Sequence, residues 1–147
     1  MKPLIISLGH RFRSDDGAGP RVLDKLRGRL DGGADFVECP GDVMQLLDAW
    51  QDRPQVCIID AFFSEQEPAG NIQRLDGLSD VLPAPVNPAS SHALNLPEAV
   101  ELGKVLHKLP QQLCVYAISG KSFNPGADLT PEVERAVDRV TEVICNA

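Results

Sequence analysis

The sequence has no long hydrophobic run and no excess of positive charge, and both absences exclude classes of protein. No stretch approaches the ~18 consecutive apolar residues that a membrane-spanning helix needs. The apolar run at residues 4–8 is too short for a signal peptide and has no cleavage-like site after it. We therefore expect a cytoplasmic protein with no membrane partner. The formal net charge is -7, and the basic residues are dispersed, which argues against a nucleic-acid partner.

Paired cysteine motifs are also missing. The four cysteines form no C-x-x-C pair, so the sequence indicates neither a structural zinc site nor a thioredoxin-type redox motif. Cys57 and Cys114 lie inside apolar runs, where a free cysteine usually packs as a small hydrophobic residue. We predict that both are buried and inert.

Short apolar segments alternate with segments of helical periodicity along the whole chain. The expected strands are residues 4–8, 36–39, 56–59, 72–75 (at an edge) and 113–118, and the expected helices are 20–30, 43–50, 96–109 and 131–144. This alternation predicts a mostly parallel sheet covered by helices on both faces, a three-layer α/β/α sandwich. The length and the absence of a linker predict one domain over residues 1–147.

Polar residues follow three of the buried segments, at the edge of the sheet where ligands usually bind in such folds. The first strand leads into Ser14-Asp15-Asp16-Gly17, the third leads into Asp60, and His92 closes a Ser90-Ser91-His92 sequence just before a helix. Two carboxylates and an imidazole suit nickel, zinc or iron and leave coordination positions open. Each residue also has a structural interpretation: a helix cap for Asp15 or Asp16, and a hydrogen-bonded loop group for Asp60 or His92.

Other motifs fail on spacing. Gly120-Lys121-Ser122 follows a strand, but Val115 stands where a phosphate-binding loop needs glycine. No G-x-S-x-G sequence is present for a serine nucleophile. Cys39 could pair with His92 as a thiolate nucleophile, although the neighbouring Glu38 disfavours the thiolate. His107 is predicted as a solvated residue within a helix.

An ordered set of motifs resembles the [NiFe]-hydrogenase maturation endopeptidases over nearly the whole chain. The set comprises Leu8-Gly9-His10, Ser14 to Gly19, Ile58-Ile59-Asp60-Ala61, Pro68-Ala69-Gly70, Ser90-Ser91-His92 and Phe123 to Val133. The resemblance implies a five-stranded, mostly parallel, phosphorylase/hydrolase-like α/β/α fold. It also implies removal of a C-terminal extension from the hydrogenase large-subunit precursor after nickel insertion.

Carried over by position, the nickel-contacting residues of that family fall on Asp16, Asp60 and His92. Asp16 and Asp60 are also the candidate catalytic residues, with no specific role assigned to either. The nickel is expected to come with the precursor, and another divalent cation could take its place. The chain departs from the family pattern at His10, where asparagine is usual, and at Pro40-Gly41-Asp42, where a Gly-Thr turn is usual.

Two alternatives remain open at this point. The same three residues could serve a nickel-dependent assembly factor or metallochaperone without protease activity. A hydrolase that depends on Cys39 is the other alternative.

Overall fold

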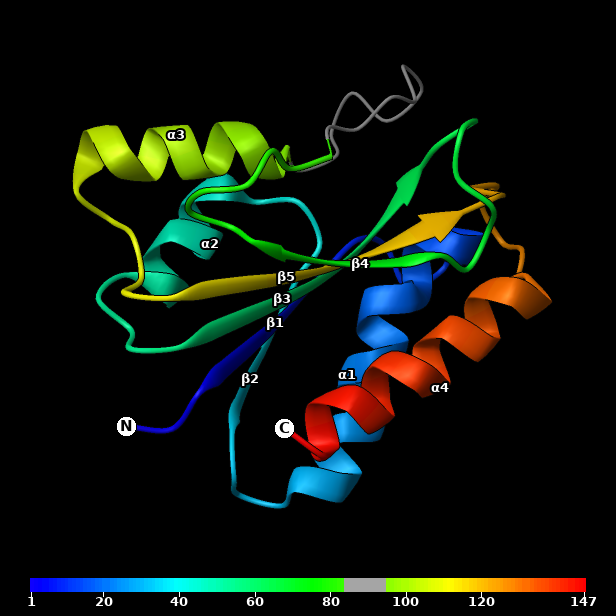
Figure 1. Ribbon diagram of the computed structural model, residues 1–147, viewed down its shortest axis with the longest axis horizontal. Coiled ribbons are helices and arrows are strands. Elements are labelled where there is room, and N and C mark those ends of the chain that lie inside the picture. Colours follow the sequence, from blue (N-terminus) through cyan, green and yellow to red (C-terminus); the bar gives the residue numbers. More distant parts are fainter. Residues whose placement is uncertain (84–94) are drawn as a thin grey trace.

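The computed structural model describes residues 1–83 and 95–147 (Figure 1). The elements are β1 (Leu4–Leu8), the 3-10 helix η1 (Ser14–Gly17), α1 (Ala18–Leu30), β2 (Asp35–Cys39), α2 (Val43–Trp50), β3 (Val56–Phe63), β4 (Ile72–Asp76), α3 (Leu96–Leu106), β5 (Leu113–Gly120) and α4 (Pro131–Cys145). The predicted alternation of strands and helices is therefore confirmed.

The five strands form one sheet in the order β2-β1-β3-β5-β4. All neighbours are parallel except β4, which runs antiparallel to β5 at the edge of the sheet. Helices α1 and α4 cover one face, and α2 and α3 cover the other (Figure 1). The expected α/β/α sandwich, with residues 72–75 in an edge strand, is confirmed.

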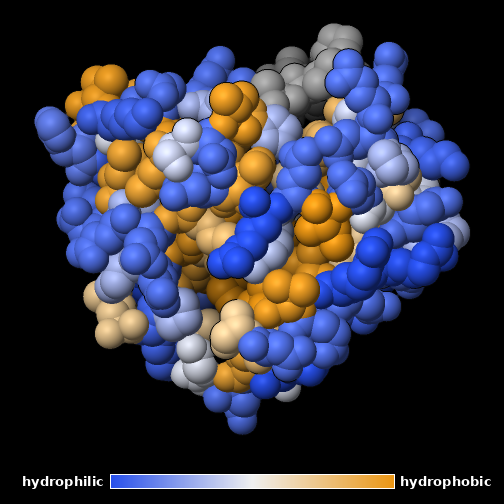
Figure 2. All heavy atoms as spheres, viewed as in Figure 1, coloured by the Kyte–Doolittle hydropathy of each residue, from blue (hydrophilic) through white to orange (hydrophobic). Residues whose placement is uncertain are grey.

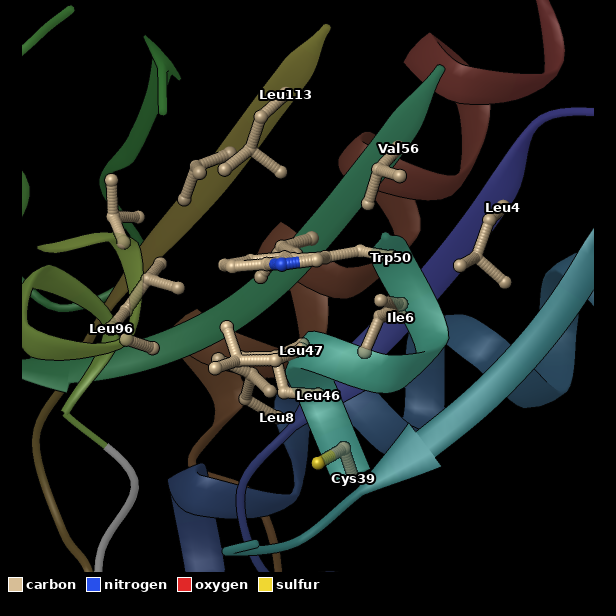
Figure 3. Close-up of a cluster of buried hydrophobic side chains, with 14 of the residues drawn as sticks. Leu4, Ile6, Leu8, Cys39, Leu46, Leu47, Trp50, Val56, Leu96 and Leu113 are labelled. Carbon is tan, nitrogen blue, oxygen red and sulfur yellow. The ribbon is translucent and has the colours of Figure 1, made fainter. Parts of the chain in front are cut away.

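Side chains that alternate along the strands supply a separate core to each face of the sheet. The core beneath α2 and α3 is centred on Trp50, whose indole ring lies between Leu47, Ile6 and Val56 (Figure 3). Trp50 is fully buried, and its Nε1 donates to the carbonyl oxygen of Lys108 at 2.7 Å. The hydrogen bond satisfies the one polar atom of the ring, so the ring can be buried without leaving a donor unpaired.

Two strands are longer than their apolar runs predict. The expected strands 56–59 and 113–118 extend to Phe63 and Gly120, because β3 and β5 pair in register from Val56–Leu113 to Phe63–Gly120. The extension places Asp60 inside β3 rather than after it.

Helix α3 is shorter than predicted. It ends at Leu106, and His107 adopts a left-handed conformation (φ 56°) as its C-terminal cap. His107 is exposed, as expected, but it lies at the end of the helix and not within it.

The prediction that Cys57 and Cys114 are buried and inert is wrong on burial. Both side chains are partly exposed and face each other on neighbouring strands. The apolar runs around them place them in the sheet, but their positions near the amino-terminal ends of β3 and β5 leave them accessible.

Over the described ranges, every helix is too short or too polar to cross a bilayer. The surface seen in Figure 2 carries apolar patches across its middle, with hydrophilic side chains around them. The expected cytoplasmic location stays a prediction.

The start of α1 is packed directly against the ends of β1 and β3, and this contact supports the site described below. A Cβ atom at Gly19 would lie 2.6 Å from the carbonyl oxygen of Ile59 and 2.7 Å from that of Leu8. Both atoms belong to the backbone of the sheet, so they cannot move aside cheaply. Gly28, in the same helix, has open space around the corresponding position.

We therefore expect opposite effects from the same substitution at these two glycines. Gly19→Ala should lower the free energy of unfolding by about 1–3 kcal/mol, because the added methyl group overpacks the helix against the sheet. Gly28→Ala should raise it by about 0.5–1 kcal/mol, since alanine is the better helix former. Urea unfolding followed by circular dichroism measures both, and equal effects would contradict the close approach.

Candidate functional site

The candidate site lies where β1 and β3 separate. The chain leaves β1 towards β2 on one side, while β3 and β5 continue on the other, so the strand order reverses at this point. Pairing between β1 and β3 ends at Ser7–Ile59, and Asp60 is the next residue of β3. Ligands in open α/β sheets bind at such a reversal, beyond the carboxyl ends of the strands (right in Figure 1).

Asp16 is held at this edge by the loop that follows β1. It lies in η1, and its Oδ2 accepts a hydrogen bond from the backbone nitrogen of His10 at 2.8 Å. Gly9 has φ +102°, and a Cβ there would lie 2.3 Å from the Asp16 carbonyl oxygen and 2.9 Å from Oδ1. Glycine is therefore required for the loop to pass so close to the carboxylate.

The departure from the family pattern at His10 leaves this contact intact, because the donor is the backbone. At Pro40-Gly41-Asp42, the other departure, Asp42 caps α2 by accepting from the backbone nitrogen of Met44 at 2.9 Å. Neither departure removes a group that positions Asp16 or Asp60.

Asp60 is partly buried beside Asp16, whose charge acts on the Asp60 carboxyl. Burial, followed by the negative charge of Asp16, raises the pKa of Asp60 to about 8, although a hydrogen bond from the Ala61 backbone opposes the shift. Burial also raises the pKa of Asp16, against the favourable hydrogen bond from His10. Near neutral pH the pair therefore retains a proton that a cation could replace.

Asp15, the neighbour of Asp16, has a structural role. It is fully buried, and its carboxylate accepts from the backbone nitrogens of Lys121 (2.8 Å), Ser122 (3.0 Å) and Thr130 (2.7 Å), and from the Thr130 hydroxyl (2.9 Å). The carboxylate thus ties the loop after β1 to the loop before α4. The sequence suggested a helix cap for Asp15 or Asp16, and neither side chain caps α1.

The partners of Asp15 were not found from the sequence. Most of these partners are backbone nitrogens more than a hundred residues away in the sequence, and a backbone nitrogen can belong to almost any residue type, so the sequence does not reveal it. Only Thr130, predicted to begin the last helix, gave a signal, and its hydroxyl binds Asp15 rather than capping α4.

His92, with Ser90 and Ser91, lies outside the described residues. The structure thus brings together two of the three predicted ligands, Asp16 and Asp60, and leaves the third untested. Within residues 1–83 and 95–147, no group of three or more histidine, cysteine, aspartate or glutamate side chains could hold a metal ion. Two carboxylates of raised pKa suit a divalent cation, but they need further donors to hold it.

Cys39 does not have the surroundings of a nucleophile. It is fully buried at the end of β2, beneath α2 (Figure 3), and burial raises the pKa of its thiol. Its Sγ donates to the carbonyl oxygen of Asp42 at 3.4 Å. A buried, protonated thiol is inert, which argues against a hydrolase that depends on Cys39.

Comparison with known proteins identifies the family. The family model for hydrogenase maturation protease (HycI) matches residues 21–147, and the chain belongs to this family. The enzyme class expected from the sequence, a hydrogenase maturation endopeptidase, is confirmed. The match begins after Asp16 and includes Asp60.

Individual relatives extend the similarity to the whole chain. The hydrogenase 2 maturation protease of Escherichia coli is 26% identical, over 100% of this chain and 90% of that protein. The solved structure of the E. coli hydrogenase maturating endopeptidase HybD superposes with a TM-score of 0.79 at 22% identity, covering 98% of this chain and 90% of that one. HybD from Thermococcus kodakarensis gives a TM-score of 0.71 at 20% identity, covering 98% and 97%. These structures share the fold.

The raised pKa of Asp60 predicts that stability falls as pH rises. The folded protein keeps the Asp60 proton up to about pH 8, whereas the unfolded chain releases it near 3.8, the ordinary pKa of an aspartate side chain. Between these values the folded state binds more protons, so the free energy of unfolding decreases with increasing pH. Asp60→Asn should remove this dependence, and its stability relative to the wild type should increase by at least about 1 kcal/mol from pH 5 to pH 7.

Urea unfolding in the presence of a chelator measures this difference. Asp48→Asn, which removes an exposed carboxylate on α2, is the control and should keep the wild-type pH dependence. Parallel curves for the wild type and Asp60→Asn would show that Asp60 ionises normally.

Proposed function

We propose that this protein removes a C-terminal extension from a [NiFe]-hydrogenase large-subunit precursor after nickel insertion. Family membership supports the protease activity, and the name of the E. coli relative supports a hydrogenase as the substrate. The observation that carries the proposal is the pairing of Asp16 and Asp60 at the reversal of strand order. There, burial of both carboxylates and the charge of Asp16 beside Asp60 favour the arrival of a cation.

The nickel in this proposal belongs to the substrate. Asp16 and Asp60 would contact an ion already held by the precursor, and His92 would complete the contact. Two carboxylates alone make an incomplete site, which fits an ion held mainly by another protein. Binding would replace the retained proton, so the contact should strengthen as the pH rises.

This arrangement makes processing depend on a loaded precursor. If much of the binding free energy comes from contacts to nickel, an empty precursor loses those contacts, and the carboxylate pair keeps its proton. The enzyme would then distinguish loaded from empty precursor because the empty one lacks the contacts to nickel, and the loss of such contacts discriminates strongly between substrates. Cleavage would then follow nickel insertion without a separate signal.

The carboxylates can also take part in the cleavage step. When bound, nickel supplies a Lewis acid close to the two side chains. With nickel bound both carboxylates would be ionised, so either could accept a hydrogen bond from the attacking water and orient it. The Oδ2 of Asp16 accepts from the His10 backbone, and this hydrogen bond would hold the Asp16 carboxylate in place beside Asp60.

Processing of a nickel-loaded precursor by purified protein tests the proposal. Mass spectrometry of the large subunit should show loss of the C-terminal peptide with the wild type. The variants Asp16→Asn, Asp60→Asn and His92→Gln should each slow this loss by about 100-fold or more, because each removes a proposed ligand or proton-transfer group.

His107→Gln is the matched control for the histidine variant. His107 caps the far end of α3, so this variant should process at the wild-type rate. Retained processing by all three site variants would contradict the assignment. Nickel-dependent binding of the precursor without loss of mass would instead identify a non-proteolytic assembly factor.

A further inference from the structure

Two cysteines lie side by side at the other end of the sheet from Asp16 and Asp60. Cys57 of β3 and Cys114 of β5 are directly paired in the parallel register. Both pack against the α1/α4 core, so their side chains are on the same face of the sheet. Cys57 lies three residues before Asp60 in β3, and Cys114 lies three residues before Ala117, the residue of β5 that pairs with Asp60. Three residues span about 10 Å along a strand.

The pair is accessible from solvent. Both cysteines are partly exposed and line a cavity of about 710 Å³, together with Arg74, Tyr116 and Gln55. The cavity opens near the amino-terminal ends of β3 and β5. A small solute can therefore reach the thiols without passing the proposed protease site.

The surroundings make the two thiols unequal. The Nε of Arg74 donates to the Sγ of Cys114 at 3.4 Å, and the guanidinium lies 6.0 Å from the centre of the Tyr116 ring. The interaction with the Cys57 thiol is the largest cause that lowers the pKa of Cys114, and the hydrogen bond and positive charge of Arg74 lower it further, although burial opposes the shift. The same contact and burial raise the pKa of Cys57 well above its usual value. Cys114 therefore carries the thiolate, and Cys57 stays protonated beside it.

The spacing of the pair permits a disulfide. Paired residues on neighbouring strands are about 4.8 Å apart. This separation falls within the range of about 4.4–6.8 Å between Cα atoms of bonded cysteines. A disulfide also requires that the two Cα–Cβ bonds do not point apart, and the side chains of Cys57 and Cys114 lie on the same face of the sheet.

We propose that Cys57 and Cys114 form a peroxide-sensitive dithiol, with Cys114 as the attacking thiolate and Cys57 as the resolving thiol. The Cys114 sulfur attacks one oxygen of the peroxide, the O–O bond breaks, and the second oxygen leaves as hydroxide, which takes a proton to become water. Cys114 is then a sulfenic acid. The Cys57 sulfur attacks it, the S–O bond breaks, and a second water leaves with the Cys57 proton. Two electrons pass from the cysteines to the peroxide, and a disulfide joins β3 to β5.

Mapping of the oxidised wild-type protein tests the proposal without depending on any variant. Treatment with hydrogen peroxide at neutral pH, followed by alkylation of the remaining thiols, should give an intact mass lower by two hydrogen atoms before the alkyl groups are counted. Digestion without reductant should release a Cys57 peptide linked to a Cys114 peptide. A disulfide to Cys145, or oxidation with no disulfide between these two residues, would overturn the proposal.

Variants separate the two roles. Cys57→Ser should stop at the Cys114 sulfenic acid, which dimedone traps, whereas Cys145→Ser should form the same disulfide as the wild type. Dimedone labelling of Cys145 in place of Cys114 in the Cys57→Ser protein would contradict the assigned order.

A pair of arginine variants tests the activation of Cys114. Arg74→Gln should slow alkylation of Cys114 by iodoacetamide at neutral pH by about tenfold, since the thiolate loses its cationic partner. Arg27→Gln is the control, because Arg27 also lies over an aromatic ring (5.7 Å from the centre of Phe36) but has no thiol partner among the described contacts. Equal rates in the two variants would show that Arg74 does not activate the thiol.

Discussion

The central constraint in this molecule is the confinement of two carboxylates, Asp16 and Asp60, where β1 and β3 separate. Burial raises the pKa of both carboxyls, and the charge of Asp16 adds to the shift at Asp60, whose pKa rises to about 8. Such an arrangement costs stability in the absence of a cation, because one carboxylate must keep its proton or two charges must share a desolvated site. In the proposed function, that cost would make the pair responsive to a metal ion brought by a partner. The proposed dependence of cleavage on a loaded precursor follows from it.

The rest of this edge of the fold keeps the two carboxylates in place. Asp15 holds the loop of Asp16 against the loop before α4 through four hydrogen-bond donors. Gly9 lets the chain pass Asp16, and Gly19 lets α1 begin against the carbonyl oxygens of Leu8 and Ile59. Adjacent aspartates thus have different roles. Asp15 has both carboxylate oxygens bound by donors, whereas Asp16 has one backbone donor and an acidic neighbour.

Hydropathy periodicity was enough to predict the fold, because short apolar runs alternate with segments of helical spacing along the chain. The sequence also placed Asp16 and Asp60 at one edge, since Asp16 follows β1 and Asp60 comes directly after the last residue of β3 that pairs with β1. It could not separate Asp15 from Asp16, because the distinction rests on distant backbone donors. The extension of β3 past Asp60 and the accessibility of Cys57 and Cys114 depend on strand register, which local composition does not encode. His92 stays a prediction from its sequence context.

Measurement of the carboxyl ionisations by carbon-13 NMR tests the central claim most directly. In metal-free protein, the Asp60 carboxyl carbon should titrate near pH 8, and the Asp16→Asn substitution should move its midpoint to lower pH. The shift would arise because the substitution removes the charge of Asp16 while keeping an acceptor for the His10 backbone. An Asp60 midpoint near pH 4, unchanged by that substitution, would contradict the proposed pairing of the two carboxylates.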